Sequence, residues 1–187
     1  MFDKCLPIIL KFEGGYVNHP KDPGGATNKG ITQKVYNSFR KSWGEPTQSV
    51  RFIAEDEVRK IYQSYWEQSR ASEFAEKMPL TALVHFDFAV NAGFKQAAKT
   101  LQRALGLELV DGIIGNRTLT AVYLSDDYEL AKMYCEERFE FYYKLTDIKP
   151  DLKVFMKGWL WRVKHLKGIV DDWSYRSKPK DNLPSIT

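Results

Sequence analysis

The sequence has few of the residues that build metal centres, phosphate-binding loops and nucleophilic triads. Two cysteines and three histidines occur in 187 residues, and they follow no metal-ligand spacing. Asn28-Lys29-Gly30 does not complete the Walker pattern of Gly, four residues and Gly-Lys-Ser/Thr. Serine, histidine and aspartate do not assemble into a catalytic triad. We therefore expect neither a metal nor a cofactor.

Long apolar runs and a strong net charge are also missing. The apolar run at residues 5–10 is too short for a signal-peptide core or a membrane span, so we expect no stable membrane insertion. Lysine and arginine number 28 against 24 aspartates and glutamates, a balance too mild for a nucleic-acid partner but compatible with an anionic cell wall. The 43% of hydrophobic residues suffices for one domain or two small, closely packed ones.

Residues 13–32 form the most unusual segment of the chain. Five glycines and two prolines among these twenty residues exclude a helix or an ordinary strand and predict a shaped loop. The apolar run before the segment predicts a short helix with Pro7 in its first turn. Glu13, the first residue of the segment, should therefore lie at the C-terminal end of that helix.

This position has a consequence for the chemistry of Glu13. The negative end of the helix dipole and the apolar neighbours Phe12 and Tyr16 disfavour a carboxylate anion, so we expect a raised pKa and a general acid. Asp22, in a polar turn, should stay ionised. Two carboxyl groups in unlike environments suit the cleavage of a glycosidic bond.

Three blocks carry a resemblance to a known family: Glu13-Gly14-Gly15-Tyr16, Asp22-Pro23-Gly24-Gly25, and Thr27-Asn28-Lys29-Gly30-Ile31-Thr32. They resemble the start of the glycoside hydrolase family 108 lysozymes, which are also described as secretion activators and phage endolysins. The resemblance implies N-acetylmuramidase activity with Glu13 as the catalytic acid. The order Glu13, Asp22 and Thr27 is similar to the catalytic order of T4-type phage lysozymes, although the threonine comes one residue earlier. This likeness implies catalytic roles for Asp22 and Thr27.

Two predicted helices downstream carry candidate substrate-binding residues. Residues 55–70 should form an amphipathic helix with Trp66 beside its apolar stripe, either as a core residue or in a cleft. A central helix should begin at Pro79, contain His85 as a hydrogen-bonded core residue, and end at Gly93. Asp87 and Asn91 share one face of this helix. That face either meets a cleft or forms hydrogen bonds with buried backbone groups. The resemblance implies substrate-binding roles for four residues: Tyr16, Trp66, Asp87 and Asn91.

The C-terminal half is predicted to be helical. Residues 97–118 resemble a predicted peptidoglycan-binding segment, although a purely structural helical hairpin explains the pattern as well. Helices should follow from Asp126 or Asp127 to Lys149 and over residues 152–170. We expect an all-α, lysozyme-like fold with a catalytic segment (1–92), a peptidoglycan-binding segment (93–173) packed with it as one globular unit, and a flexible tail (174–187). A substrate groove should lie between the N-terminal and C-terminal segments.

These expectations define a lysozyme that cleaves the β-1,4 bond between N-acetylmuramic acid and N-acetylglucosamine in peptidoglycan glycan strands. Two alternatives are a lytic transglycosylase that uses Glu13 alone and a non-catalytic, wall-binding or secretion-assisting protein. Without an evident signal peptide, a protein made in the bacterial cytoplasm would reach the wall through a holin pore or a secretion system. We expect a monomer in which Cys5 and Cys135 are free thiols.

Overall fold

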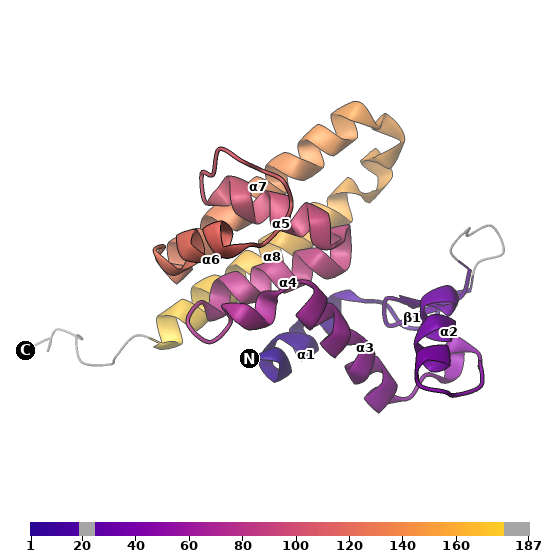
Figure 1. Ribbon diagram of the computed structural model, residues 1–187. Helices are drawn as coiled ribbons and strands as arrows, with labels where there is room; N and C mark the ends of the chain where they lie inside the picture. Colours follow the sequence, from indigo (N-terminus) through magenta and orange to yellow (C-terminus); the bar gives the residue numbers. More distant parts are fainter. Residues whose placement is uncertain (19–24, 178–187) are drawn as a thin grey trace, which may run out of the picture. The chain divides into compact units, whose positions relative to one another are not determined.

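The computed structural model describes residues 1–18 and 25–177 and has an all-α, lysozyme-like fold with one small antiparallel hairpin among these residues (Figure 1). The chain divides into two compact units, residues 1–68 and 69–187. The first unit contains α1 (Phe2–Phe12), β1 (Thr27–Asn28), β2 (Ile31–Thr32), α2 (Gln33–Ser42), η1 (Val50–Phe52) and α3 (Glu55–Gln68). The second contains η2 (Ala71–Glu73), α4 (Pro79–Ala92), α5 (Phe94–Ala104), α6 (Asn116–Tyr123), α7 (Asp127–Ile148), η3 (Pro150–Leu152) and α8 (Lys153–Ser177).

Helix α1 begins earlier than the sequence predicts. It starts at Phe2, so Pro7 lies in the second turn, and the prediction of a first-turn proline is wrong. Proline removes one helical hydrogen bond, to the carbonyl of Asp3, but Asp3 and Pro7 are both exposed, so water can hydrate that carbonyl. The buried residues recur at helical spacing and form one apolar face: Phe2, Cys5, Leu6 and Ile9.

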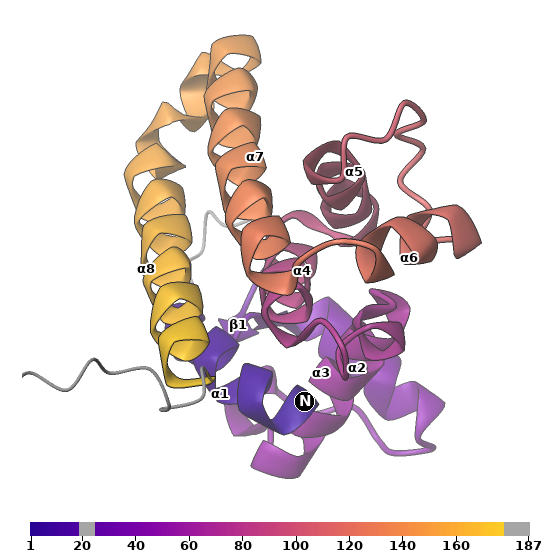
Figure 2. The same cartoon turned by 90° about the vertical axis from the view of Figure 1, so that its left-hand side faces the viewer.

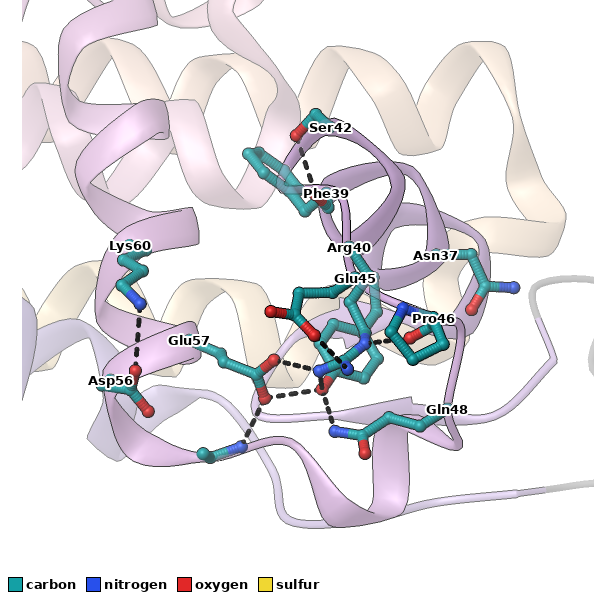
Figure 3. Close-up of polar contacts among 12 residues, drawn as sticks. Asn37, Phe39, Arg40, Ser42, Glu45, Pro46, Gln48, Asp56, Glu57 and Lys60 are labelled. Carbon is teal, nitrogen blue, oxygen red and sulfur yellow. Dashed lines mark hydrogen bonds and ion pairs between the residues drawn. The ribbon is translucent and has the colours of Figure 1, made fainter.

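A buried polar cluster joins α2 to α3 within the first unit (Figure 3). The Tyr36 hydroxyl donates to Oε2 of Glu57 at 2.6 Å, and Arg40 forms an ion pair with the same carboxylate. The backbone N–H of Ala54 also donates to Oε2 of Glu57 at 2.9 Å, which stabilises the N-terminal end of α3. Gln48, from the loop between the helices, donates to the Tyr36 hydroxyl. The cluster therefore holds the loop and both helices together.

Helix α4 is the centre of the second unit, packed by α5, α7 and α8. Its predicted limits are confirmed, because Pro79 is the first residue and Gly93, with φ +88°, follows the last. His85 is a hydrogen-bonded core residue, as predicted: Nε2 lies 2.9 Å from the Ser69 carbonyl oxygen and Nδ1 lies 3.0 Å from the Tyr134 hydroxyl. Burial lowers the pKa of His85 to about 4, so the ring is neutral at pH 7.

The two long C-terminal helices, α7 and α8, lie side by side (Figure 2). Asp126 accepts a hydrogen bond from the N–H of Glu129 at 2.9 Å and caps α7, which confirms the predicted start. Helix α8 continues to Ser177, seven residues beyond the predicted end at Val170. No glycine or proline occurs between Asp171 and Ser177, so no helix-breaking residue interrupts this stretch.

Cys5 and Cys135 are both buried, and the structure forms no disulfide between them. Burial raises the pKa of Cys135 to about 12, so its sulfur stays protonated and unreactive at neutral pH. Within residues 1–18 and 25–177, we find no helix that is both long enough and apolar enough to cross a membrane.

Candidate active site

Glu13 occupies the position that the sequence predicts, at the C-terminal end of α1. Its backbone N–H still donates to the Ile9 carbonyl at 3.3 Å, but its φ and ψ of −82° and 133° are extended. The chain therefore leaves the helix at Glu13. The residue is half-buried, whereas Gly14, Gly15 and Tyr16 after it are exposed.

The segment that follows Glu13 pairs with the hairpin. Val17 and Thr27 exchange two backbone hydrogen bonds of 2.8 Å, and the N–H of Lys29 donates to the Gly14 carbonyl at 3.1 Å. These bonds attach the loop after α1 to β1.

The turn between β1 and β2 lies against the carboxyl group of Glu13. Lys29 and Gly30 have φ of +49° and +74°, as a two-residue hairpin turn of type I′ requires. A Cβ atom on Gly30 would lie 2.6 Å from Oε2 of Glu13 and 2.8 Å from the hydroxyl oxygen of Tyr62. The Tyr62 hydroxyl donates to the Lys29 carbonyl at 2.8 Å. Glu13 therefore lies against the Lys29-Gly30 turn, and Tyr62 of α3 holds the backbone of that turn in place.

The other predicted residues of this unit have separate environments. The Thr27 hydroxyl donates to the Gly25 carbonyl at 3.5 Å from the start of β1. Tyr16 is 39% exposed, and the guanidinium carbon of Arg51 lies 5.6 Å from the centre of its ring. Trp66 is 3% exposed and packs on Phe2 with ring centroids 6.0 Å apart, which favours the core explanation for Trp66. Asp22 lies outside the described residues.

Asp87 is an internal counter-ion in the second unit. Its side chain has no exposed surface, and its oxygens accept from Nη2 of Arg138 and from Nη2 of Arg162, each at 2.8 Å. Burial alone would raise the pKa of Asp87, but the charges of the two arginines hold it below its usual value. The guanidinium carbon of Arg138 also lies 4.6 Å from the centre of the Phe88 ring. This geometry favours the structural explanation for Asp87.

Asn91, one turn further along α4, is half-buried and accepts a hydrogen bond from the Tyr142 hydroxyl. The Tyr142 ring is stacked on Trp159 with centroids 5.0 Å apart and planes 17° apart. Asn91 thus has a fixed oxygen, and its amide nitrogen is the group that remains to act as a donor to a ligand.

The glycine-containing pattern after α5 is explained by bonds within its own loop. Gln102 donates to Oδ1 of Asp111 at 2.7 Å and accepts from the N–H of Gly112 at 2.8 Å. The Thr118 hydroxyl donates to the Ile113 carbonyl at 3.3 Å. These contacts shape the connection between α5 and α6, in agreement with the structural explanation of the pattern.

Sequence reasoning missed the roles of Gly30 and Tyr62. Tyr62 lies on α3, and its ring is in the core with no exposed surface. Its hydroxyl group, however, reaches the turn beside Glu13. The available signal was Gly30, because a two-residue hairpin turn favours glycine where φ is positive; no local signal links that turn to Tyr62.

Comparisons with known proteins identify the class of the chain. Residues 6–93 match the family model described as glycosyl hydrolase 108, and residues 96–164 match the model described as a predicted peptidoglycan domain. The solved structure of SagA from Brucella abortus is 31% identical to the chain, covers 94% of it and 97% of its own length, and has a TM-score of 0.74. No curated protein matches the chain.

The fold and the matched segments define a lysozyme-type glycoside hydrolase that acts on the peptidoglycan of the cell wall. The chain belongs to the glycosyl hydrolase 108 family. The expected resemblance, fold and enzyme class are thereby confirmed. The two family models adjoin between residues 93 and 96, whereas the compact units divide between Gln68 and Ser69, because α4 packs with the C-terminal helices.

Proposed function

We propose that the protein is an N-acetylmuramidase that hydrolyses the β-1,4 bond between N-acetylmuramic acid and N-acetylglucosamine, with Glu13 as the general acid. The observation that carries the proposal is the position of the Glu13 carboxyl group. It extends from the end of α1 and meets the Gly30 turn. A carboxyl group held against a rigid backbone keeps a constant direction toward the leaving oxygen, which proton transfer requires.

The other roles follow the chemistry of the side chains. Asp22 holds or activates the attacking water, and Thr27 orients that water through its hydroxyl group. Tyr16 offers an exposed ring face to a sugar, and Asn91 offers an amide donor. Asp87 has a structural role in this proposal, as the buried counter-ion of Arg138 and Arg162. The groove between the N-terminal and C-terminal segments, export by a holin or secretion system, and the monomeric state all stay predictions.

The test is mass spectrometry of the fragments released from purified peptidoglycan by the wild type, by Glu13→Gln and by Glu67→Gln. Glu67 is an exposed glutamate on α3 of the same unit, so its replacement controls for the loss of one carboxylate. We expect fragments with reducing-end muramic acid from the wild type and Glu67→Gln, and none from Glu13→Gln.

Other outcomes would replace the proposal with one of the two alternatives. Anhydro-muramic products from the wild type would identify a lytic transglycosylase. Equal release by all three proteins would exclude Glu13 as the acid. No release by any folded protein from walls of several chemotypes would favour a wall-binding or secretion-assisting role.

A further inference from the structure

Arg51 differs from the other arginines of the first unit in the kind of partner it has. Arg40 forms an ion pair with Glu57, and Arg59 forms one with Asp3. The side chain of Arg51, in η1, is exposed, and no carboxylate within residues 1–18 and 25–177 pairs with it. Its positive charge is therefore available to a ligand.

The backbone around Arg51 is held in place by two polar side chains. Nδ2 of Asn28 donates to the carbonyl oxygens of Val50 and Arg51 at 3.1 Å and 3.3 Å. The N–H of Val50 donates to Oε1 of Gln33 at 2.7 Å. Asn28 is 9% exposed, so water competes little for its bonds. The segment η1 therefore has a fixed position beside β1 and the start of α2.

Tyr16 is attached to the same strand. Val17, the next residue, exchanges two backbone hydrogen bonds of 2.8 Å with Thr27 of β1. The guanidinium carbon of Arg51 lies 5.6 Å from the centre of the Tyr16 ring. A guanidinium over an aromatic face keeps the N–H groups of its edge for hydrogen bonds. The ring and the cation thus form one surface, and Tyr16 lies three residues after Glu13 in the sequence.

This pair matches a sugar that carries an acidic branch. The apolar face of a pyranose suits a tyrosine ring, and a guanidinium binds a carboxylate through two charge-assisted hydrogen bonds. In peptidoglycan, the lactyl group of each muramic acid carries a peptide stem that bears free carboxylates. A sugar that contacts Tyr16 brings such a stem to the side of the ring where Arg51 lies. A chitin-like glycan has no such carboxylate.

We propose that Arg51 is a specificity-determining residue, which binds a carboxylate of the peptide stem of peptidoglycan while Tyr16 contacts the sugar. Arg51 thereby favours acidic peptidoglycan strands over neutral glycans. The proposal rests on the peptidoglycan substrate and the Tyr16 contact of the proposed function, but it requires no bond cleavage, so binding tests it separately from catalysis.

The test compares two forms of one ligand by isothermal titration calorimetry with the Glu13→Gln protein. The first form is a peptidoglycan tetrasaccharide whose peptide stems have free carboxylates. The second form is synthesised with primary amides in place of these carboxylates, which keeps the size and removes the negative charge. At low salt, we expect the acidic form to bind about fivefold more tightly, the factor that corresponds to an exposed ion pair. This preference should shrink at about 0.5 M salt.

Arginine variants of the same protein assign the preference to one residue. Arg51→Gln should raise Kd for the acidic form about fivefold and leave Kd for the amidated form unchanged. Arg59→Gln is the matched control, because the Arg59 side chain is 52% exposed and its guanidinium carbon lies 5.2 Å from the centre of the Phe2 ring. It should change neither Kd more than about twofold. Arg51→Lys keeps the charge without the planar fork, so its Kd for the acidic form should be intermediate.

Circular dichroism confirms that each variant is folded. If Arg51→Gln weakened binding of both forms equally, the arginine would only support Tyr16, and the proposal would be overturned. Equal binding of the two forms by the Glu13→Gln protein, binding of neither form, or equal effects of Arg51→Gln and Arg59→Gln would overturn it as well. If the Glu13→Gln protein still released fragments from peptidoglycan, Glu13 would fail as the acid, while the binding comparison, made at a temperature where cleavage is slow, would still decide the role of Arg51.

Discussion

Replacement of Gly30 by alanine should displace the carboxyl group of Glu13. The added Cβ would lie 2.6 Å from Oε2 of Glu13, whereas ordinary van der Waals contact begins at 3.4 Å. The carboxyl group or the turn must therefore shift by about 1 Å, and a misplacement of that size costs roughly 100-fold in rate. We expect kcat on soluble peptidoglycan fragments to fall by about that factor.

The same substitution also strains the backbone, and Gly44→Ala is the control for this strain. Gly44 follows α2 in the same unit and has φ +77°, against +74° for Gly30, but a Cβ there would meet no heavy atom of the described residues within 4 Å. A side chain in the left-handed region costs about 1–2 kcal/mol, which lowers the thermal midpoint by roughly 2–8 °C for a chain of this size. Both variants should lose this stability.

The two variants are compared by turnover below their thermal midpoints and by thermal unfolding followed by circular dichroism. Gly30→Ala should lose at least as much stability as Gly44→Ala, because its Cβ also clashes with Glu13 and Tyr62, and only Gly30→Ala should lose kcat. If Gly30→Ala kept turnover within about threefold of Gly44→Ala, the turn would not position Glu13, and the proposed geometry of the acid would be refuted.

Three further predictions concern buried polar contacts. Tyr62→Phe removes the donor to the Lys29 carbonyl and should lower kcat about tenfold with KM unchanged. Tyr134→Phe also loses a buried hydroxyl bond to a backbone carbonyl (2.7 Å), but it should leave kcat unchanged. A lower kcat for Tyr134→Phe together with an unchanged kcat for Tyr62→Phe would contradict the role of Tyr62. Asp87→Asn leaves two arginines without a counter-charge and should destabilise the fold by about 3–5 kcal/mol, a fall of roughly 6–20 °C in thermal midpoint. Because the folded-state pKa of Asp87 is lowered, its contribution is full above the usual carboxyl pKa and is lost as pH falls through the lowered value; thermal scans from pH 7 downward should show the gap between wild type and Asp87→Asn closing.

Much of the fold follows from local patterns in the sequence. Pro79 and Gly93 delimit α4 because proline suits a first turn and glycine accepts a positive φ. Asp126 caps α7. The amphipathic pattern of α3 leaves Trp66 either in the core or in a cleft, and the structure buries it. Where local signals were ambiguous, the boundaries moved. Pro7 lies inside α1 because its turn is exposed, and α8 runs on to Ser177 in the absence of a breaker.

The sequence by itself determined the helical class, the family and the place of Glu13 at a helix end, because these depend on residue types at short, fixed spacings. Only the tertiary structure decided what surrounds these residues. It paired Asp87 with Arg138 and Arg162, which lie 51 and 75 residues further along the chain. It also brought the Tyr62 hydroxyl, 33 residues after Lys29, to the turn against Glu13. Such contacts between distant segments depend on how helices pack, and no local pattern of residues encodes them.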